Sequence, residues 1–303
     1  MANVNYQFFL SMLIIALGYV SKRFKLVSEK DGEGIAKIIF NFTLPALVIT
    51  TFSTIQVDFS LIMMPVINVI FGGFMAILAI FVFKNEKRKD RGMMSMLMQG
   101  FNIGLFAYPL VEAIWGQKGL KYFAMFDMGN AILVFGINYL FACYFASDEG
   151  TVDFKSVLHK VSRSIPLLAY MITLAVNLSG FHFPTVVLDI SKIVTKANMP
   201  LSLLLLGIYL SFSLEKSYWK NMARILVFRY GIGLAVGITL YFLMPFDQYF
   251  RSSVLIGLVL PITATVLPYT AQFGYNHKFV GTTTNVSIVI SFILMWVIFG
   301  LGI

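Results

Sequence analysis

An apolar run of membrane-spanning length at residues 93–114 contains the stretch Gln99-Gly-Phe-Asn102-Ile-Gly104-Leu-Phe-Ala-Tyr108-Pro109. Glycine lowers helix propensity, and proline removes a backbone donor and crowds the preceding turn, so this run is predicted to be a helix broken near mid-membrane. A second run at 251–273 contains Pro261-Ile-Thr263-Ala-Thr265-Val-Leu-Pro268 and is predicted to break in the same way. The alternative is a pair of ordinary proline kinks, whose freed backbone groups are paired by neighbouring helices.

The composition indicates a polytopic membrane protein. Of the 303 residues, 58% are hydrophobic and 12% are charged, and the mean hydropathy is +0.83, which is far too apolar for a soluble core of this size. Apolar runs long enough to cross a bilayer recur along the whole chain. The pattern predicts ten spans, at 6–21, 35–54, 60–83, 93–114, 120–147, 162–180, 188–213, 223–244, 251–273 and 279–302. We therefore expect an all-α protein whose function lies inside the helical bundle.

The net charge of +9 follows membrane topology rather than nucleic-acid binding. If the N-terminus lies outside, most lysines and arginines fall in loops on the cytoplasmic side, including the clusters at 22–37, 84–91 and 155–163. Lys192 and Lys196 fall on the opposite side, which a misplaced boundary of the seventh span would explain. The pattern predicts a multi-pass protein of the plasma membrane with both termini outside the cytoplasm and no nucleic-acid partner.

Two parts of the sequence match at a shift of 155 residues, about half the chain length. The shift places Pro45 on Pro200 and Asn130 on Asn285. With five predicted spans in each half, the second half enters the membrane from the opposite side, so repeats at 1–150 and 151–303 are predicted to be inverted. Inverted repeats are typical of secondary transporters, because one set of contacts can be assembled in two mirrored ways around a central site.

The two broken spans supply the candidate binding site. The N-terminus of a half-helix presents free N–H groups and a positive dipole end, and both favour an anion. The candidate substrate-binding residues are Asn102, Gly104, Tyr108, Pro109, Pro261, Thr263, Thr265 and Pro268. Further polar residues expected in the interior are Gln99, Asp127, Asn130, Gln272 and Asn285.

Two charged residues inside predicted spans need an interpretation. Asp127, Asn130 and Asn138 share one helix face, and ionisable residues inside membranes lean towards function, so Asp127 is a candidate carrier of a coupling proton or sodium ion. The alternative places Asp127 near the outer interface, where it caps or pairs locally. Arg229 follows Arg224 by five residues, and we expect its side chain to snorkel to the cytoplasmic interface.

Several motifs, in their order and spacing, resemble the auxin efflux carrier family of membrane transporters over essentially the whole chain. They are Asn41-Phe-Thr-Leu-Pro45-Ala-Leu, Asn102-Ile-Gly-Leu-Phe-Ala-Tyr-Pro109-Leu, Asp127-Met-Gly-Asn130 and Pro268-Tyr-Thr-Ala-Gln-Phe-Gly-Tyr-Asn276. The resemblance implies ten spans in two inverted five-helix repeats, with a scaffold from spans 1, 2, 6 and 7 and a transport domain from spans 3–5 and 8–10. Broken helices four and nine would cross and hold a small organic anion, and Asn102 matches the family's substrate-contacting asparagine.

The sequence thus predicts a secondary transporter that moves a small organic anion, auxin-like or malate- and malonate-like, by elevator-type alternating access. Sodium-coupled bile acid symporters share the implied architecture and are one alternative, and a ligand sensor without transport is another. The motifs of zinc proteases and serine hydrolases are absent, and no histidine has a metal partner at helical spacing, so neither an enzyme nor a metal site is predicted. A homodimer through Gly233-x-x-x-Gly237 stays open.

Overall fold

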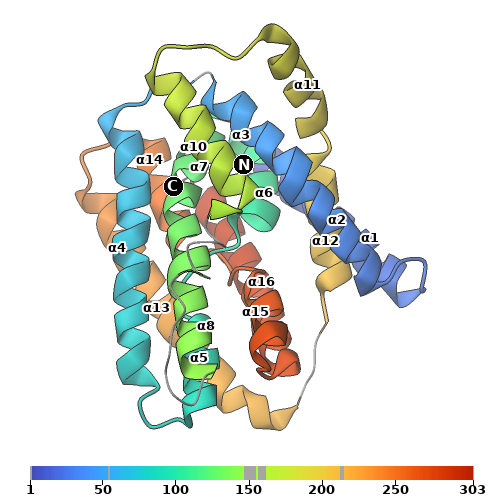
Figure 1. Cartoon of the computed structure of the whole chain (residues 1–303), viewed down its shortest axis with the longest axis vertical. Helices are drawn as coiled ribbons and strands as arrows, with labels where there is room; N and C mark the ends of the chain where they lie inside the picture. The colour runs from blue at the N-terminus through green and yellow to red at the C-terminus, as the bar shows by residue number, and fades with distance from the viewer. Residues whose placement is uncertain (1, 54, 147–154, 156–161, 212–214, 303) are drawn as a thin grey trace.

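The computed structural model describes residues 2–53, 55–146, 155, 162–211 and 215–302, so the expected repeat boundary at 150/151 lies outside the described residues. Every named element in the described part is a helix (Figure 1). The elements are α1 (Ala2–Arg23), α2 (Glu29–Ile38), η1 (Ile39–Thr43), α3 (Leu44–Phe52), α4 (Phe59–Val82), α5 (Arg88–Met96), η2 (Ile103–Ala107), α6 (Tyr108–Trp115), α7 (Gln117–Ile132), η3 (Leu133–Ile137), α8 (Asn138–Ala146), α10 (Ile165–Leu178), α11 (Thr185–Thr195), α12 (Asn198–Tyr209), η4 (Lys216–Tyr218), α13 (Trp219–Leu243), α14 (Gln248–Leu258), α15 (Val266–Phe273) and α16 (His277–Gly300).

Six helical stretches in the described part are long and apolar enough to cross a membrane, which supports the predicted multi-pass membrane protein. They are Val4–Arg23, Glu29–Phe52, Phe59–Val82, Gln117–Ala146, Lys216–Leu243 and His277–Gly300. The predicted span at 162–180 is the 14-residue helix α10. The predicted spans at 93–114, 188–213 and 251–273 are each divided between two or three helical elements.

Helix α4 shows how the apolar sequence is shared between lipid and protein. Ile70, Phe74, Ile77 and Phe81 lie at helical spacing on one face and are exposed, whereas Asn68 and the apolar residues on the other face are buried. An exposed apolar stripe of this kind suits a hydrocarbon environment and would be costly in water. Helices α4 and α16 begin at polar caps: the Asp58 carboxylate accepts a hydrogen bond from the Leu61 N–H at 2.9 Å, and the Asn276 side chain accepts one from the Phe279 N–H at 3.0 Å.

Pro45 and Pro109 widen the helix before them rather than break it, whereas Pro261 lies between α14 and α15. Pro45 and Pro109 each follow a π-helical turn, η1 or η2, by two residues. Proline donates no N–H to the carbonyl four residues back, and its ring crowds that carbonyl, so the preceding turn widens. The Tyr108 N–H, for example, donates to the Ile103 carbonyl five residues back. The expectation that Pro109 and Pro268 mark the breaks is therefore wrong, because both lie inside helices, α6 and α15.

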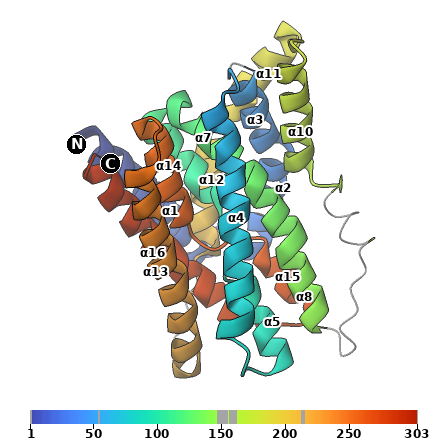
Figure 2. The ribbon, with the colours of Figure 1, turned by 90° about the vertical axis from the view of Figure 1, so that its left-hand side faces the viewer.

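The helices pack in two groups (Figures 1 and 2). In the first group, α1 and α2 pack on α12, and α10 and α11 pack on α3. In the second, α4 packs on α7, α5 on α8, α13 on α14, and α15 on α8 and α16. Within the first group the Thr43 hydroxyl donates to the Asn198 side-chain carbonyl at 2.8 Å, and these residues are 155 positions apart in the chain. Residues matched by the sequence shift therefore meet in space.

Glycines let helix backbones touch at the crossings. A Cβ at Gly207 of α12 would overlap the Ile15 carbonyl of α1, and a Cβ at Gly18 of α1 would overlap the Leu204 carbonyl of α12. Gly233 of α13 similarly lies against the Leu258 carbonyl of α14, so the Gly233-x-x-x-Gly237 motif serves packing within the chain. No side chain can be added at these points without separating the helices.

We predict that Gly207→Ala destabilises the protein by about 1–3 kcal/mol, because the added methyl group must push α1 away from α12. Gly231→Ala is the matched control: a Cβ at Gly231 of α13 meets no atom within 4 Å, and alanine gains up to about 1 kcal/mol of helix propensity. The thermal unfolding temperature of the purified protein in detergent should fall for the first variant and hold or rise for the second. If Gly207→Ala unfolded at the same temperature as the unmodified protein, the α1–α12 crossing would have to be looser than described.

Candidate functional site

Two unwound segments cross in the middle of the second helix group. Residues 97–102 separate α5 from η2, and residues 259–265 separate α14 from α15. Phe101 and Ile262 form an isolated antiparallel β-bridge, and the Asn102 N–H donates to the Pro261 carbonyl at 2.9 Å. Gly100 has a φ of +77°, a left-handed conformation that favours glycine, and it turns the chain from α5 into the bridge. Each broken helix thus supplies part of the other's missing backbone pairing.

Arg229 of α13 caps both broken helices at the carbonyl end of their first half. Its guanidinium donates to the Met98 carbonyl at 2.9 Å and the Gly100 carbonyl at 2.6 Å beyond α5. It also donates to the Leu260 carbonyl at 3.2 Å beyond α14, with longer bonds to the carbonyls of Leu97 and Pro261. Helix C-termini leave unpaired carbonyls and a negative dipole end, and a fork of five N–H donors suits both.

The expectation that Arg229 snorkels to the cytoplasmic interface is wrong. The residue is 1% exposed, and its guanidinium lies 4.7 Å from the centre of the Phe101 ring. Among the described residues no carboxylate forms an ion pair with it. Spacing from Arg224 predicted a short reach to water, but the unpaired carbonyls of the two breaks attract the side chain inward. Carbonyl dipoles, rather than an acid, compensate its charge.

The helix that comes after each broken helix, α7 or α16, holds the unwound backbone in place. The Asn130 side chain on α7 accepts from the Phe101 N–H at 2.8 Å and donates to the Phe101 carbonyl at 2.9 Å. On α16 the Ser287 hydroxyl accepts from the Ile262 N–H at 3.0 Å. Asn285, which the 155-residue shift pairs with Asn130, donates instead to the Ser211 carbonyl at 2.6 Å. The counterpart of Asn130 in contacts is therefore Ser287.

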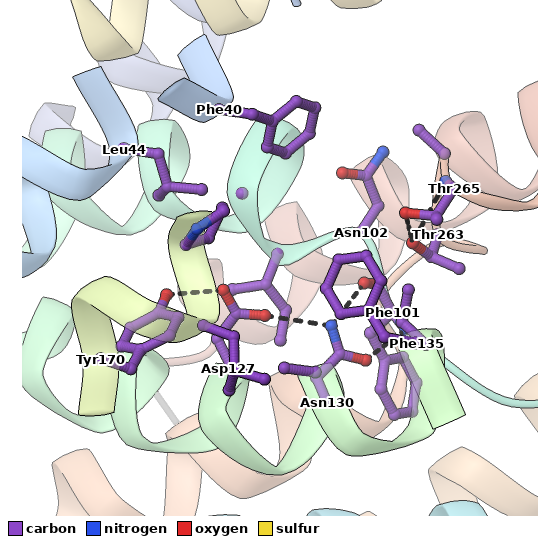
Figure 3. Close-up of a pocket in the computed structure, with 17 residues that line it drawn as sticks. Phe40, Leu44, Phe101, Asn102, Asp127, Asn130, Phe135, Tyr170, Thr263 and Thr265 are labelled. Carbon is purple, nitrogen blue, oxygen red and sulfur yellow. Dashed lines mark hydrogen bonds between the residues drawn. The ribbon is translucent and has the colours of Figure 1, made fainter. Parts of the chain in front are cut away.

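A cavity of about 60 Å³ lies beside the crossing (Figure 3). A space of this size holds a few water-sized groups. It brings together six of the predicted site residues, and these are Asn102, Gly104, Asp127, Asn130, Thr263 and Thr265. The other lining residues are Phe40, Leu44, Phe101, Ile103, Ala131, Val134, Phe135, Pro166, Leu167, Tyr170 and Ala264.

Asn102 presents an unused hydrogen-bond donor at this cavity. The residue is 4% exposed; its side-chain carbonyl accepts from the Leu105 N–H at 3.3 Å and caps the second half-helix. Its amide nitrogen has no hydrogen-bond partner, and buried polar groups of this kind are rare because they lose their hydration without compensation. Across the crossing, the Thr263 hydroxyl donates to the Thr265 hydroxyl at 3.2 Å.

Asp127 is buried inside the protein, and its carboxylate has partners on helices α6 and α10 as well as on its own helix. Its carboxylate accepts from the Tyr170 hydroxyl at 2.6 Å, from the Asn130 amide at 3.0 Å and from the Tyr108 hydroxyl at 3.3 Å. The two tyrosine hydroxyls also contact each other. Sequence analysis missed Tyr170 because a single tyrosine in an apolar run carries no local signal; only the packing of α10 beside α7 brings it to Asp127.

The other predicted site residues lie outside the cavity lining. Tyr108 reaches Asp127 from α6, and the Pro261 carbonyl belongs to the crossing. Gln99 is buried, and its side-chain atoms have no hydrogen-bond partner. Gln272 donates to the Tyr139 hydroxyl at 3.4 Å. Pro109 lies inside α6 and Pro268 inside α15, and Asn285 donates to the Ser211 carbonyl.

We predict that Arg229→Met prevents recovery of folded protein, because each buried carbonyl left without a donor costs about 1–3 kcal/mol. Arg229→Lys should fold with reduced stability, since an ammonium cannot span both carbonyl clusters as a planar fork does. Lys220→Met, at an exposed residue of the same helix, is the control and should behave as the unmodified protein. Size-exclusion elution in detergent after heating measures how much of each variant stays folded and monodisperse. A monodisperse Arg229→Met protein of unchanged thermal stability would contradict the capping role.

Comparison with known proteins identifies the family of this chain. Residues 8–299 match the family described as membrane transport protein. The chain is 23% identical over 304 residues to an uncharacterized transporter of Methanocaldococcus jannaschii, covering 95% of this chain and 96% of that protein. It is 24% identical over 209 residues to an uncharacterized transporter of Methanothermobacter thermautotrophicus, covering 66% of each. The resemblance found in the motifs is confirmed, and the chain belongs to the membrane transport protein family, which is the family of the auxin efflux carriers.

Proposed function

We propose that this protein is a secondary transporter for a small organic anion that binds at the crossing of the two broken helices. The observation that carries the proposal is the Asn102 amide, which is buried without an acceptor at a cavity where two half-helix N-termini meet. An anion supplies the acceptor that this donor lacks.

The electrostatics of the crossing support an anionic substrate. The second half-helices begin at residues 103 and 266, and the residues just before these starts, Asn102 and Thr265, line the cavity. Their first N–H groups have no partner within the helix, and the dipole makes these ends positive. Arg229 adds a full positive charge on the other side of the Phe101 ring. A carboxylate is the small organic group that satisfies these donors together, so we propose an auxin-like or a malate- or malonate-like substrate.

The position of the cavity supports alternating access by an elevator motion. We propose two inverted five-helix repeats, 1–150 and 151–303, whose first helices form a scaffold from α1, α2, α3, α10, α11 and α12. The remaining helices form the transport domain. Phe40, Leu44 and Tyr170 line the cavity from the scaffold side, whereas Asn102, Asp127 and the threonines line it from the transport side. A site between two separately packed groups can be exposed to either face of the membrane when one group slides past the other.

This orientation and location are also part of the proposal. The distribution of lysines and arginines supports a plasma-membrane protein with both termini outside the cytoplasm. A ligand sensor on the same fold would bind the anion without moving it, and a sodium-coupled carrier would respond to a sodium gradient.

We predict saturable uptake of at least one organic anion into proteoliposomes that contain the purified protein. The panel is labelled malate, malonate and indole-3-acetate, with proton and sodium gradients imposed separately and protein-free liposomes as the control. Binding without flux would favour the sensor. Movement of a cation or a neutral solute in place of every anion would overturn the substrate class.

We predict that Asn102→Ala raises the Kd of the transported anion about 10- to 100-fold, because one hydrogen bond to a charged group contributes about 1.5–3 kcal/mol. Asn221→Ala, near the start of α13 and outside the cavity lining, is the matched control and should bind normally. Isothermal titration of each detergent-purified variant gives the Kd, and size-exclusion elution verifies folding. A folded Asn102→Ala variant with unchanged Kd would place the substrate elsewhere.

A further inference from the structure

We propose that the anion binds together with a proton taken up by Asp127, so that the protein is a proton–anion symporter. This inference rests on the proposed function, because it assigns the coupling ion of the same site. It is carried by the place of Asp127 in the cavity and by the character of the groups around its carboxylate.

The carboxylate and the proposed anion share one small space. Asp127 and Asn102 line the same cavity of about 60 Å³. Two negative charges this close repel strongly, the more so because most of the lining residues are apolar and screen charge poorly. Adding one proton to the Asp127 carboxylate gives a neutral carboxylic acid and removes the repulsion. Anion binding and proton uptake therefore favour each other.

No cation neutralises Asp127 in place of a proton. Its three partners, Tyr108, Tyr170 and Asn130, are neutral donors, and none of the ion pairs in the described part involves it. These three O–H and N–H donors leave few free lone pairs on the carboxylate for a sodium ion, whereas a proton needs only one. The site is built for a proton rather than for a metal cation.

The other charged groups around α7 are directed elsewhere. On α6, Glu112 lies one turn beyond Tyr108 and outside the cavity lining. On α13, Arg229 is bonded to the carbonyls of the crossing, and at the start of α14 Asp247 accepts from the Tyr122 hydroxyl. Helix α4 contributes the neutral Asn68, which donates to the Phe126 carbonyl. None of these groups is bonded to Asp127.

The tyrosine pair lets the site gain or lose a proton without moving its heavy atoms. In the ionised state the Tyr170 hydroxyl donates to Asp127 and the Tyr108 hydroxyl contacts both groups. After proton uptake, the carboxylic acid donates to the Tyr170 oxygen, and the Tyr170 hydroxyl turns to donate to Tyr108. The exchange requires only the rotation of hydroxyl groups, because the three oxygens already lie in contact.

Tyr170 also connects protonation to motion. It belongs to α10 of the scaffold group, and Asp127 belongs to α7 of the transport group, so their hydrogen bond crosses the sliding interface. A hydrogen bond to an ionised carboxylate is about twice as strong as a neutral one. Proton uptake weakens this connection at the moment the anion binds, which releases the loaded transport group.

The test is isothermal titration of the purified protein with malate, malonate and indole-3-acetate between about pH 7 and 8.5, where these acids are fully ionised. Each titration is repeated in two buffers of different ionisation enthalpy, which gives the number of protons taken up per anion. We expect about one proton per anion and a Kd that rises up to about tenfold per pH unit at the alkaline end. This measurement uses the unmodified protein and stands even if a variant fails to fold.

Asp127→Asn keeps the shape and the acceptor for Tyr170 but cannot take up a proton, so its Kd should be independent of pH. Glu112→Gln is the matched control, since it removes a carboxylate outside the cavity and should retain the full pH dependence. Anion binding without proton uptake, or proton uptake that persists in Asp127→Asn, would overturn the symport and leave the anion site intact. Failure of all three anions to bind at every pH would overturn both proposals.

Discussion

The crossing of two broken helices depends on the guanidinium of Arg229. The first half of each broken helix ends inside the bundle with unpaired carbonyls, which hydrocarbon cannot solvate. One side chain donates to the carbonyls of both ends and adds the positive charge that their dipoles favour. With these ends joined, the Phe101–Ile262 bridge can form, and the second half-helices begin next to each other. The cavity is a consequence of that arrangement.

The two halves of the crossing share their construction but differ in their chemistry. In each half, a polar side chain on the next helix holds the unwound backbone, and Asn130 and Ser287 take that role. Around the cavity the likeness ends: the first half contributes the Asn102 amide and the Asp127 carboxylate, and the second half contributes two threonine hydroxyls and the Tyr170 hydroxyl. In our proposal the donor to the anion and the acceptor of the proton therefore both belong to the first half.

The contacts across the two helix groups relate the site to movement. Within the groups, helices touch closely enough that glycine is required at Gly18 and Gly207. Between the groups, the cavity and the Tyr170–Asp127 hydrogen bond occupy the interface. In our proposal the two groups slide past each other at this interface, and the charge of the bound anion and the proton on Asp127 determine when they slide.

Apolar periodicity and composition alone determined the membrane class, most helix positions and the two interrupted runs, because bilayer thickness and helix propensity act locally along the chain. Motif order was enough to recognise the family. Four of the predicted site residues that line the cavity, Asn102, Gly104, Thr263 and Thr265, lie at or beside the interruptions, where Gly100 and Pro261 weaken the helix; Asp127 and Asn130 were predicted from the polar face of α7. Tertiary structure alone decided the roles of Arg229 and Tyr170. It also decided that Ser287, rather than Asn285, is the counterpart of Asn130 in holding the unwound backbone. A side chain's partner depends on unpaired groups that distant segments bring to it, and spacing along one helix carries no record of them.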